Sequence, residues 1–370
     1  MSVPPPALGD LLRRLDGHAT AGLPVPDDGR FPEEAMRRLT EDGVLRAVLP
    51  EAFGGLGLGT EPGRGRALLA FLHAIGRIGL PLGRLVEAHV NALRIVIRYG
   101  DREQGAAVAT AVETGALFGL WVTDPPDGGG LRLEEDGEGL RLVGGKQFCS
   151  GAGHVTHAVV TAFDPACHDR RLLLLPFDGS ERVTPLAAPL AGMKAATTGQ
   201  VEMTGRHLPR TALIGMPGDY LQEPDFSAGA WRSSAVALGG LFQLIELVRR
   251  QLSARGRTED PHQRLRFGEM LIAHETGRLW LAETGSLAED LRAPAEEIVA
   301  RVGLARTAVE RACLDGIERA QRSLGLAGFL TDNPVERLMR DLQTYLRQPA
   351  ADEVLHLAAG HFMRLPLPPL

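Results

Sequence analysis

Apolar residues recur at helical spacing through the first 115 residues of the chain. In segment 82–100 they form one face that is apolar enough to be buried between other helices. Its members are Leu85, Val86, His89, Val90, Leu93 and Val96. Upstream, Pro32 stands where a helix would begin and Gly43 where it would end. The pattern predicts a helical N-terminal domain over residues 1–115.

Between residues 116 and 215 the helical spacing of apolar residues is replaced by a pattern typical of strands. Short runs rich in β-branched or aromatic residues are separated by Gly, Pro or Asp, among them "LFGLWVTD", "HAVVTAF" and "RRLLLLPFD". No helix-length segment lies between these runs. The pattern therefore predicts a central antiparallel sheet or barrel.

From about residue 226 the helical period returns, in long amphipathic stretches at 231–254, 261–290 and 295–324. A further helix is expected to begin in "DNPVERLMRDL", with Asn333 as its cap and Pro334 just inside it. Its apolar spacing breaks at Pro349 and resumes at Val354. We therefore expect an α+β fold: helices at 1–115, a β-domain at 116–215 and a helical bundle at 226–370.

Composition narrows the class of protein without naming an activity. The 370 residues are 44% hydrophobic and carry a formal net charge of -6, which gives no electrostatic reason to expect a nucleic-acid partner. No run approaches about 18 consecutive apolar residues, and no basic stretch leads into an apolar one at the N-terminus, so we expect neither a membrane span nor a signal peptide. Three scattered cysteines without a CxxC motif fit a reduced, cytoplasmic protein.

Two β-segments place a hydroxyl group near their ends. "WVTDPPDGGG" contains Thr123, and "GGKQFCSGAG" contains Ser150 with Phe148 two residues before it. Regular alternation along a strand would put Phe148 and Ser150 on one face. An aromatic plane beside a hydroxyl suits a flat heteroaromatic ring, although ordinary packing gives the same pattern. The glycine run "GGLGLG" at 54–59 lacks the preceding strand and following helix of a dinucleotide-binding turn, and no metal site is expected.

Five segments follow one another along the chain in a specific order: "VLPEAFGGLGLG", "LWVTDP", "VGGKQFCSGAG", "GMKAATTGQVEMTG" and "GLAGFLTDNPVERLMRDL". Together they resemble the successive signature blocks of the acyl-CoA dehydrogenase family. The resemblance implies a helical N-terminal domain, a central β-domain and a C-terminal four-helix bundle with FAD between them. It also implies a homodimer or homotetramer, and helices 231–254 and 295–324 have broad apolar faces that one subunit would leave uncovered.

The resemblance extends to single cofactor-binding positions in the β-domain. "WVTDP" is similar to the family's "VTEP", which implies flavin contact for Thr123, with Leu120 and Val122 alongside. "KQFCS" is similar to "KxWIT". This match implies that Phe148 flanks the isoalloxazine, where the family has a tryptophan, and that Ser150 hydrogen-bonds it in place of a threonine.

Two further predicted cofactor-binding positions lie in the helical bundle. "SARGR" resembles the stretch whose arginine reaches the FAD pyrophosphate across a subunit interface, which implies that role for Arg255. "SLGLAGF" resembles "IFGGNGF", a glycine turn beside the FAD of the neighbouring subunit, and implies that role for Gly325. Both positions therefore imply a cofactor shared between subunits.

The catalytic base departs from the family pattern. Common members end the C-terminal helix at a glutamate that abstracts the substrate α-proton, and counting from Arg340 puts Pro349 at that position. Another branch places its base near the start of the first bundle helix. Here that stretch is "AGAWRSSA", which has no carboxylate and offers Arg232 as a substrate-binding candidate. Asp352 and Glu353 follow the proline, where stabilising a helix start is their simpler role.

Our first hypothesis is an FAD-dependent oxidoreductase that dehydrogenates an acyl thioester or related acyl group, with acyl-CoA as the substrate partner. An electron-transfer partner is compatible with this activity. A flavin-dependent monooxygenase or oxidase on the same fold is an alternative, because such enzymes need no α-carbon base. A non-catalytic subunit that retains the fold is the third hypothesis.

Overall fold

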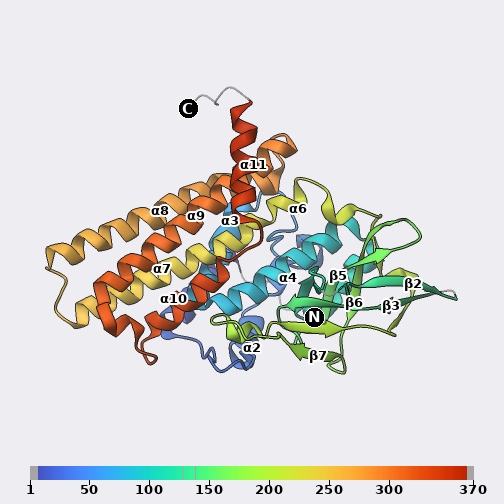
Figure 1. Cartoon of the computed structure of the whole chain (residues 1–370), viewed down its shortest axis with the longest axis horizontal. Coiled ribbons are helices and arrows are strands. Elements are labelled where there is room, and N and C mark those ends of the chain that lie inside the picture. The colour runs from blue at the N-terminus through green and yellow to red at the C-terminus, as the bar shows by residue number, and fades with distance from the viewer. Residues whose placement is uncertain (1–6, 127, 138, 365–370) are drawn as a thin grey trace.

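The computed structural model of this chain describes residues 7–126, 128–137 and 139–364. Helices precede and follow a β-region, which lies at one end of the molecule, while the α7–α8 connection lies at the other (Figure 1). The N-terminal helices are α1 (Leu8–Ala21), α2 (Glu33–Glu41), α3 (Gly65–Ile78), α4 (Leu80–Tyr99) and α5 (Arg102–Glu113). The C-terminal helices are α6 (Asp225–Ala228), α7 (Ala230–Ala254), α8 (Pro261–Asp290), α9 (Ala295–Leu324), α10 (Pro334–Tyr345) and α11 (Ala351–Met363).

The helix α4 is buried along most of its length. Its predicted apolar face is enclosed, because α4 packs against α3, α7 and β1. His89 of this face joins the helical and β parts: its Nδ1 accepts the Phe118 N–H at 3.2 Å, and its Nε2 lies 3.2 Å from the Leu45 carbonyl oxygen. Burial lowers the pKa of His89 to about 4. The imidazole is therefore neutral at pH 7 and can accept at one nitrogen while it donates at the other.

The β-region contains two sheets. Its strands are β1 (Phe118–Trp121), β2 (Arg132–Asp136), β3 (Gly139–Val143), β4 (Gly145–Cys149), β5 (His157–Asp164), β6 (Asp169–Pro176), β7 (Arg182–Pro185), β8 (Gly199–Glu202), β9 (His207–Leu208) and β10 (Leu213–Ile214). The larger sheet has the order β10-β6-β5-β2-β3-β9 with β1 beside β5, and the smaller has the order β4-β8-β7.

The expectation of a wholly antiparallel sheet holds for most pairs but not for all. β1 runs parallel to β5, and β2 meets β5 in a single parallel pair, Arg132 with Phe163. A parallel return normally needs a long crossover. Here β2, β3 and β4 supply that length between β1 and β5. The absence of a helix between the strands was therefore not sufficient to predict that every strand pair is antiparallel.

The bundle helices begin and end close to the predicted limits. Asp260 caps α8 by accepting the His262 N–H at 2.9 Å, and Asn333 caps α10 by accepting the Val335 N–H at 3.0 Å, as predicted for Asn333. The apolar surface left uncovered by one chain is different from our expectation. It lies mainly on α8 rather than on α7 or α9, at Leu265, Leu271, Ile272 and Leu279. No helix in the described ranges is long and apolar enough to cross a membrane.

Glycines set the distance between α3 and α7. A Cβ at Gly76 would lie 2.1 Å from the Val236 carbonyl oxygen, and one at Gly239 would lie 2.1 Å from the His73 carbonyl oxygen. Each helix therefore presents a bare backbone to the other at the crossing. This close approach fixes the position of α7, which carries Arg232 into the interior.

We predict that Gly239→Ala lowers the free energy of unfolding by about 1–3 kcal/mol, because the added methyl group must displace a backbone carbonyl. Gly268→Ala in α8 is the matched control, since no heavy atom lies within 4 Å of its Cβ position. In the control, replacing a helical glycine should be neutral or stabilise by up to about 1 kcal/mol. Thermal unfolding of both variants checks this, and equal melting temperatures would contradict it.

Candidate active site

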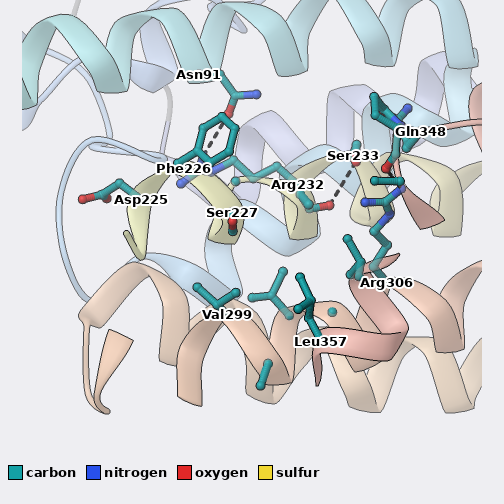
Figure 2. Close-up of a pocket in the computed structure, with 18 of the residues that line it drawn as sticks. Asn91, Asp225, Phe226, Ser227, Arg232, Ser233, Val299, Arg306, Gln348 and Leu357 are labelled. Carbon is teal, nitrogen blue, oxygen red and sulfur yellow. Dashed lines mark hydrogen bonds between the residues drawn. The ribbon is translucent and has the colours of Figure 1, made fainter. Parts of the chain in front are cut away.

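A cavity of about 700 Å³ lies where α4, α6, α7, α9 and α11 meet the end of β1. Leu120 and Val122, both predicted near the flavin, line it from the β-region. Figure 2 shows Asp225 toward one end of the part drawn, and Arg306 with Gln348 toward the other. The volume is within the range of about 300–1,000 Å³ that is typical of small-molecule sites.

A buried ion-pair network forms one wall of this cavity. Glu289 of α8 accepts from Arg232 of α7 at 2.7 Å and from Arg94 of α4 at 2.6 Å. Arg94 and Arg98 both contact Asp225, at 3.0 Å and 2.6 Å. Burial alone would raise the pKa of Glu289, but Arg232 and Arg94 outweigh it and hold the pKa below its usual value. The network thereby keeps the Glu289 carboxylate charged inside the protein.

The polar wall continues along α4 to the β-region. Arg232 Nη1 donates to Asn91 Oδ1 at 2.9 Å, and the Asn91 amide donates to one oxygen of Glu87. The other Glu87 oxygen accepts from Arg84, whose Nε lies 3.2 Å from Ser150 Oγ. Glu87 is only 3% exposed and lines the cavity. It is therefore a buried carboxylate at the site, at a position that our sequence analysis did not identify.

A signal for these residues was present in the sequence. Glu87, Asn91, Arg94 and Arg98 recur at every third or fourth position of α4, which places them on one side of the helix. Such a polar stripe usually indicates a solvated face, so periodicity alone could not distinguish a solvent-facing surface from a cavity wall. The packing of the other helices around α4 makes this side of the helix a cavity wall.

The structure brings the two predicted flavin-binding β-segments together. The Gln147 N–H donates to the Thr123 carbonyl oxygen at 2.9 Å, and Trp121 Nε1 donates to the Ser150 carbonyl oxygen at 3.0 Å. Thr123 is exposed, and Phe148 is 49% exposed. Ser150 is buried, with its hydroxyl beside Arg84.

The alternation that we assumed for Phe148 and Ser150 is wrong. The register of β4 shifts between Lys146 and Cys149, and Phe148 has a φ of 54°. A bulge of this kind interrupts the two-residue period and re-aims the side chain. Phe148 therefore presents its ring to solvent, whereas Ser150 lies beyond the strand in the interior.

Arg255 and Gly325 are not brought to these β-segments within one chain. Arg255 is the exposed C-cap residue of α7, and its Nη2 donates to Gln251 Oε1 at 3.3 Å. Gly325 begins the 3-10 helix η6 (Gly325–Phe329) with a φ of 58° and open space around its Cβ position. Gln251 bonds Asn333 next to η6, so both residues lie at the bundle end that is remote from the β-region (Figure 1).

Pro349 lines the cavity from the turn between α10 and α11. It offers neither a carboxylate nor a backbone N–H, and its carbonyl oxygen accepts from Arg306 Nη2 at 2.7 Å. A new helix, α11, starts at Ala351 as expected. Asp352 and Glu353 are exposed in its first turn and are not among the residues lining the cavity.

Arg232, our substrate-binding candidate, lines the cavity and is 4% exposed. Its nitrogens already donate to Glu289 and Asn91. Burial lowers its pKa, although Glu289 opposes this effect. Substrate contact by Arg232 remains a prediction, and its hydrogen-bonding capacity is largely used within the protein. Across the described ranges, no cluster of three or more His, Cys, Asp or Glu side chains is arranged to hold a metal ion.

Family models match both helical parts of the chain. The model of the acyl-CoA dehydrogenase N-terminal domain matches residues 21–115, and that of the acyl-CoA dehydrogenase C-terminal domain matches residues 235–348. This chain belongs to the acyl-CoA dehydrogenase family. The oxidoreductases of this family are flavoproteins, and their cofactor is FAD.

Curated relatives and solved structures are similar over most of the chain. An acyl-CoA dehydrogenase of Bacillus subtilis is 21% identical, covering 90% of this chain and 90% of that protein. A glutaryl-CoA dehydrogenase of Desulfococcus multivorans is 26% identical, covering 86% and 85%. The butyryl-CoA dehydrogenase structure from Megasphaera elsdenii has a TM-score of 0.83 at 16% identity, covering 96% and 98%. A dibenzothiophene monooxygenase structure from Paenibacillus has a TM-score of 0.84 at 18% identity, covering 98% of each chain. At these identities the structural likeness shows the fold alone.

The residues around β1 and β4 fit a flavin on two observations. The ring of Phe148 is an apolar plane that the protein covers only in part, since the residue is 49% exposed. Thr197 Oγ1 is buried without a hydrogen-bond partner in the described part of the chain. Its loop adjoins Ser150, because the Gly151 N–H donates to the Ala196 carbonyl oxygen at 2.8 Å. An aromatic plane and a spare buried hydroxyl suit a flat ring with polar edges.

We predict that Glu289→Gln destabilises the protein by about 3–5 kcal/mol at pH 7, because Arg232 and Arg94 lose their buried counter-charge. The folded pKa of Glu289 is lowered, so its contribution is present above the unfolded pKa of about 4.3 and is lost as pH falls through the folded value. The difference from wild type should therefore shrink below about pH 4.

Urea unfolding at about pH 7, 5 and 3 measures this difference. Glu246→Gln is the matched control, because Arg249 and Arg250 hold the pKa of Glu246 at about 2 on the surface of α7. The control should cost less than about 1 kcal/mol. Equal losses in the two variants would show that the buried network contributes no more than a surface pair.

Proposed function

We propose that this protein is an FAD-dependent oxidoreductase of the acyl-CoA dehydrogenase type that removes an α-proton and a β-hydride from an acyl thioester or related acyl group. Family membership supports the reaction class. One structural observation carries the proposal: a buried carboxylate, Glu87, lines the same cavity as Leu120 of β1 and Val122 just after it. Dehydrogenation requires such a proton acceptor near the flavin, and Pro349 cannot provide one.

In this proposal the FAD ring lies against the β-region, where Leu120, Val122 and Thr123 contact it, Phe148 flanks it and Ser150 bonds its edge. Arg255 and Gly325 contact the FAD of a neighbouring subunit. Their distance from the β-segments within one chain, and the exposed apolar residues on α8, both support a homodimer or homotetramer. When bound, FAD accepts the hydride that leaves the β-carbon.

Glu87 accepts the α-proton in this scheme. Of the carboxylates that line the cavity, Asp225 is held by two arginines and Glu296 is exposed on α9. Glu87 has one guanidinium partner, Arg84, and one amide partner, Asn91. These two bonds fix the orientation of the carboxylate, and its burial excludes water from the site where the proton moves.

A flavin-dependent monooxygenase or oxidase is the second candidate, and Pro349 favours it. Oxygen-activating enzymes of this fold need no α-carbon base, so losing the family glutamate would cost them nothing. A non-catalytic subunit is the third candidate.

The absorbance spectrum of the purified protein distinguishes the three candidate functions. Anaerobic bleaching of the flavin band by an acyl-CoA supports dehydrogenation, rapid use of reduced flavin with oxygen supports the second, and a colourless protein that takes up no FAD supports the third.

We predict that Arg255→Ala weakens FAD retention by about 10-fold or more, because charge-assisted contacts to phosphate are strong hydrogen bonds. Arg278→Ala is the control, since Arg278 is an exposed arginine of α8 paired with Glu275. FAD dissociation followed by fluorescence measures the effect, and light scattering should give a dimer or tetramer. Unchanged retention in Arg255→Ala, or a monomer at micromolar concentration, would contradict the shared site.

We predict that Glu87→Gln slows anaerobic flavin reduction by about 10²–10⁴-fold, the usual contribution of a positioned base, without loss of FAD. Asp352→Asn is the control: its carboxylate is exposed in α11, so flavin reduction should be unchanged and stability only modestly lowered. Pro349→Glu should raise the reduction rate, because it returns a carboxylate to the cavity wall. Stopped-flow absorbance measures all three rates. A Glu87→Gln rate close to wild type, with the FAD spectrum intact, excludes Glu87 as the base.

A further inference from the structure

Arg306 differs from Arg94, Arg98 and Arg232, which line the same cavity, and from Arg364, which lines it but is exposed. Arg94, Arg98 and Arg232 each contact a carboxylate within 4 Å. Arg306 has no such ion pair among the described residues, and its guanidinium donates to the carbonyl oxygen of Pro349 at 2.7 Å. Burial lowers the pKa of Arg306, with Glu310 opposing the effect. Since Glu310 is itself paired with Arg347, Arg306 is a partly buried cation with spare donors and no carboxylate partner.

On one side of Arg306 there is little room, in a side cavity that Glu310 and apolar residues also line. Arg306, Ser233 and Gln348 lie between the main cavity and a side cavity of about 20 Å³, and Figure 2 shows the three together. Such a volume is about that of one water molecule. Tyr345 lines the side cavity, is only 4% exposed, and its hydroxyl has no hydrogen-bond partner in the described part of the chain. This unused hydroxyl faces the side cavity, and the charges that act on it are those of Glu87 and Arg84.

The charges that line the cavity also favour an anionic ligand. Five arginines and three carboxylates line it, although the whole chain has a formal charge of -6. Of these carboxylates, Asp225 and Glu87 are already bonded to arginines, and Glu296 is exposed. Glu289 balances Arg94 and Arg232, so an anionic group in the cavity would pair with Arg306, whereas a purely apolar chain would leave this guanidinium without a carboxylate partner.

We propose that Arg306 binds a carboxylate carried by the acyl group of the substrate, so that the preferred substrate is the thioester of a dicarboxylic acid rather than that of a simple fatty acid. The planar guanidinium offers paired N–H donors that match the two carboxylate oxygens. This inference rests on the proposed acyl-thioester function.

The test compares glutaryl-CoA with valeryl-CoA, because the two acyl groups have the same number of carbons and differ in a terminal carboxylate. Isothermal titration of the FAD-loaded protein under anaerobic conditions measures both dissociation constants. Wild type should bind glutaryl-CoA at least about 10-fold more tightly, the usual effect of one charge-assisted hydrogen-bonded pair. Arg306→Gln should remove this difference by weakening glutaryl-CoA alone.

Two further variants keep the test decisive. Arg306→Lys retains the charge and should keep part of the preference, and Arg311→Gln applies the same substitution to an exposed residue of α9 and should keep all of it. Melting temperatures identify any variant that is misfolded. If Arg306→Gln is misfolded, the proposal is tested by the affinities of wild type and of Arg306→Lys for the two thioesters. Equal affinities in wild type, or an Arg306→Gln effect of the same size on both ligands, would overturn the proposal.

Binding and flavin reduction separate this inference from the proposed function. A preference for glutaryl-CoA that disappears in Arg306→Gln supports the carboxylate site even where neither thioester bleaches the flavin, an outcome that counts against dehydrogenation only. Flavin bleaching by both thioesters without any preference supports dehydrogenation and refutes the carboxylate site.

Discussion

The burial of Glu289 is the constraint on which the interior of this protein depends. A carboxylate enclosed between helices is costly unless its charge is balanced. Arg232 and Arg94 balance it from two different helices, and Arg94 continues to Asp225 on a third. One buried charge therefore determines how α4, α6, α7 and α8 are placed relative to one another. The cavity lies beside this network, where α4, α6 and α7 face α9 and α11.

The same network makes one wall of the cavity polar. Polar groups run without interruption from Glu289 through Arg232, Asn91 and Glu87 to Arg84 beside the β-region. The turn at Pro349 adds a carbonyl oxygen and the neighbouring guanidinium of Arg306.

The candidate flavin site is divided within one chain. The β1 and β4 segments form one part, beside the cavity, while Arg255 and η6 lie at the far end of the bundle. Because long helices separate the two parts, the proposed function requires another subunit to bring the second part to the first. The apolar residues exposed on α8 indicate where such a subunit would bury surface.

Local patterns in the sequence determined the helices, several of their caps and the family. The stretches 231–254 and 261–290 match α7 and α8 to within a residue, and Asn333 caps α10, because periodicity and capping depend on neighbours in the chain. Tertiary structure decided the parallel pairing of β1 with β5 and the outward turn of Phe148, since strand partners and bulges depend on residues distant in sequence. It also decided that Glu87 and Arg306 face a cavity. A polar residue on a helix has the same periodicity whether it faces water or an enclosed site, and only the packing of the other helices distinguishes the two.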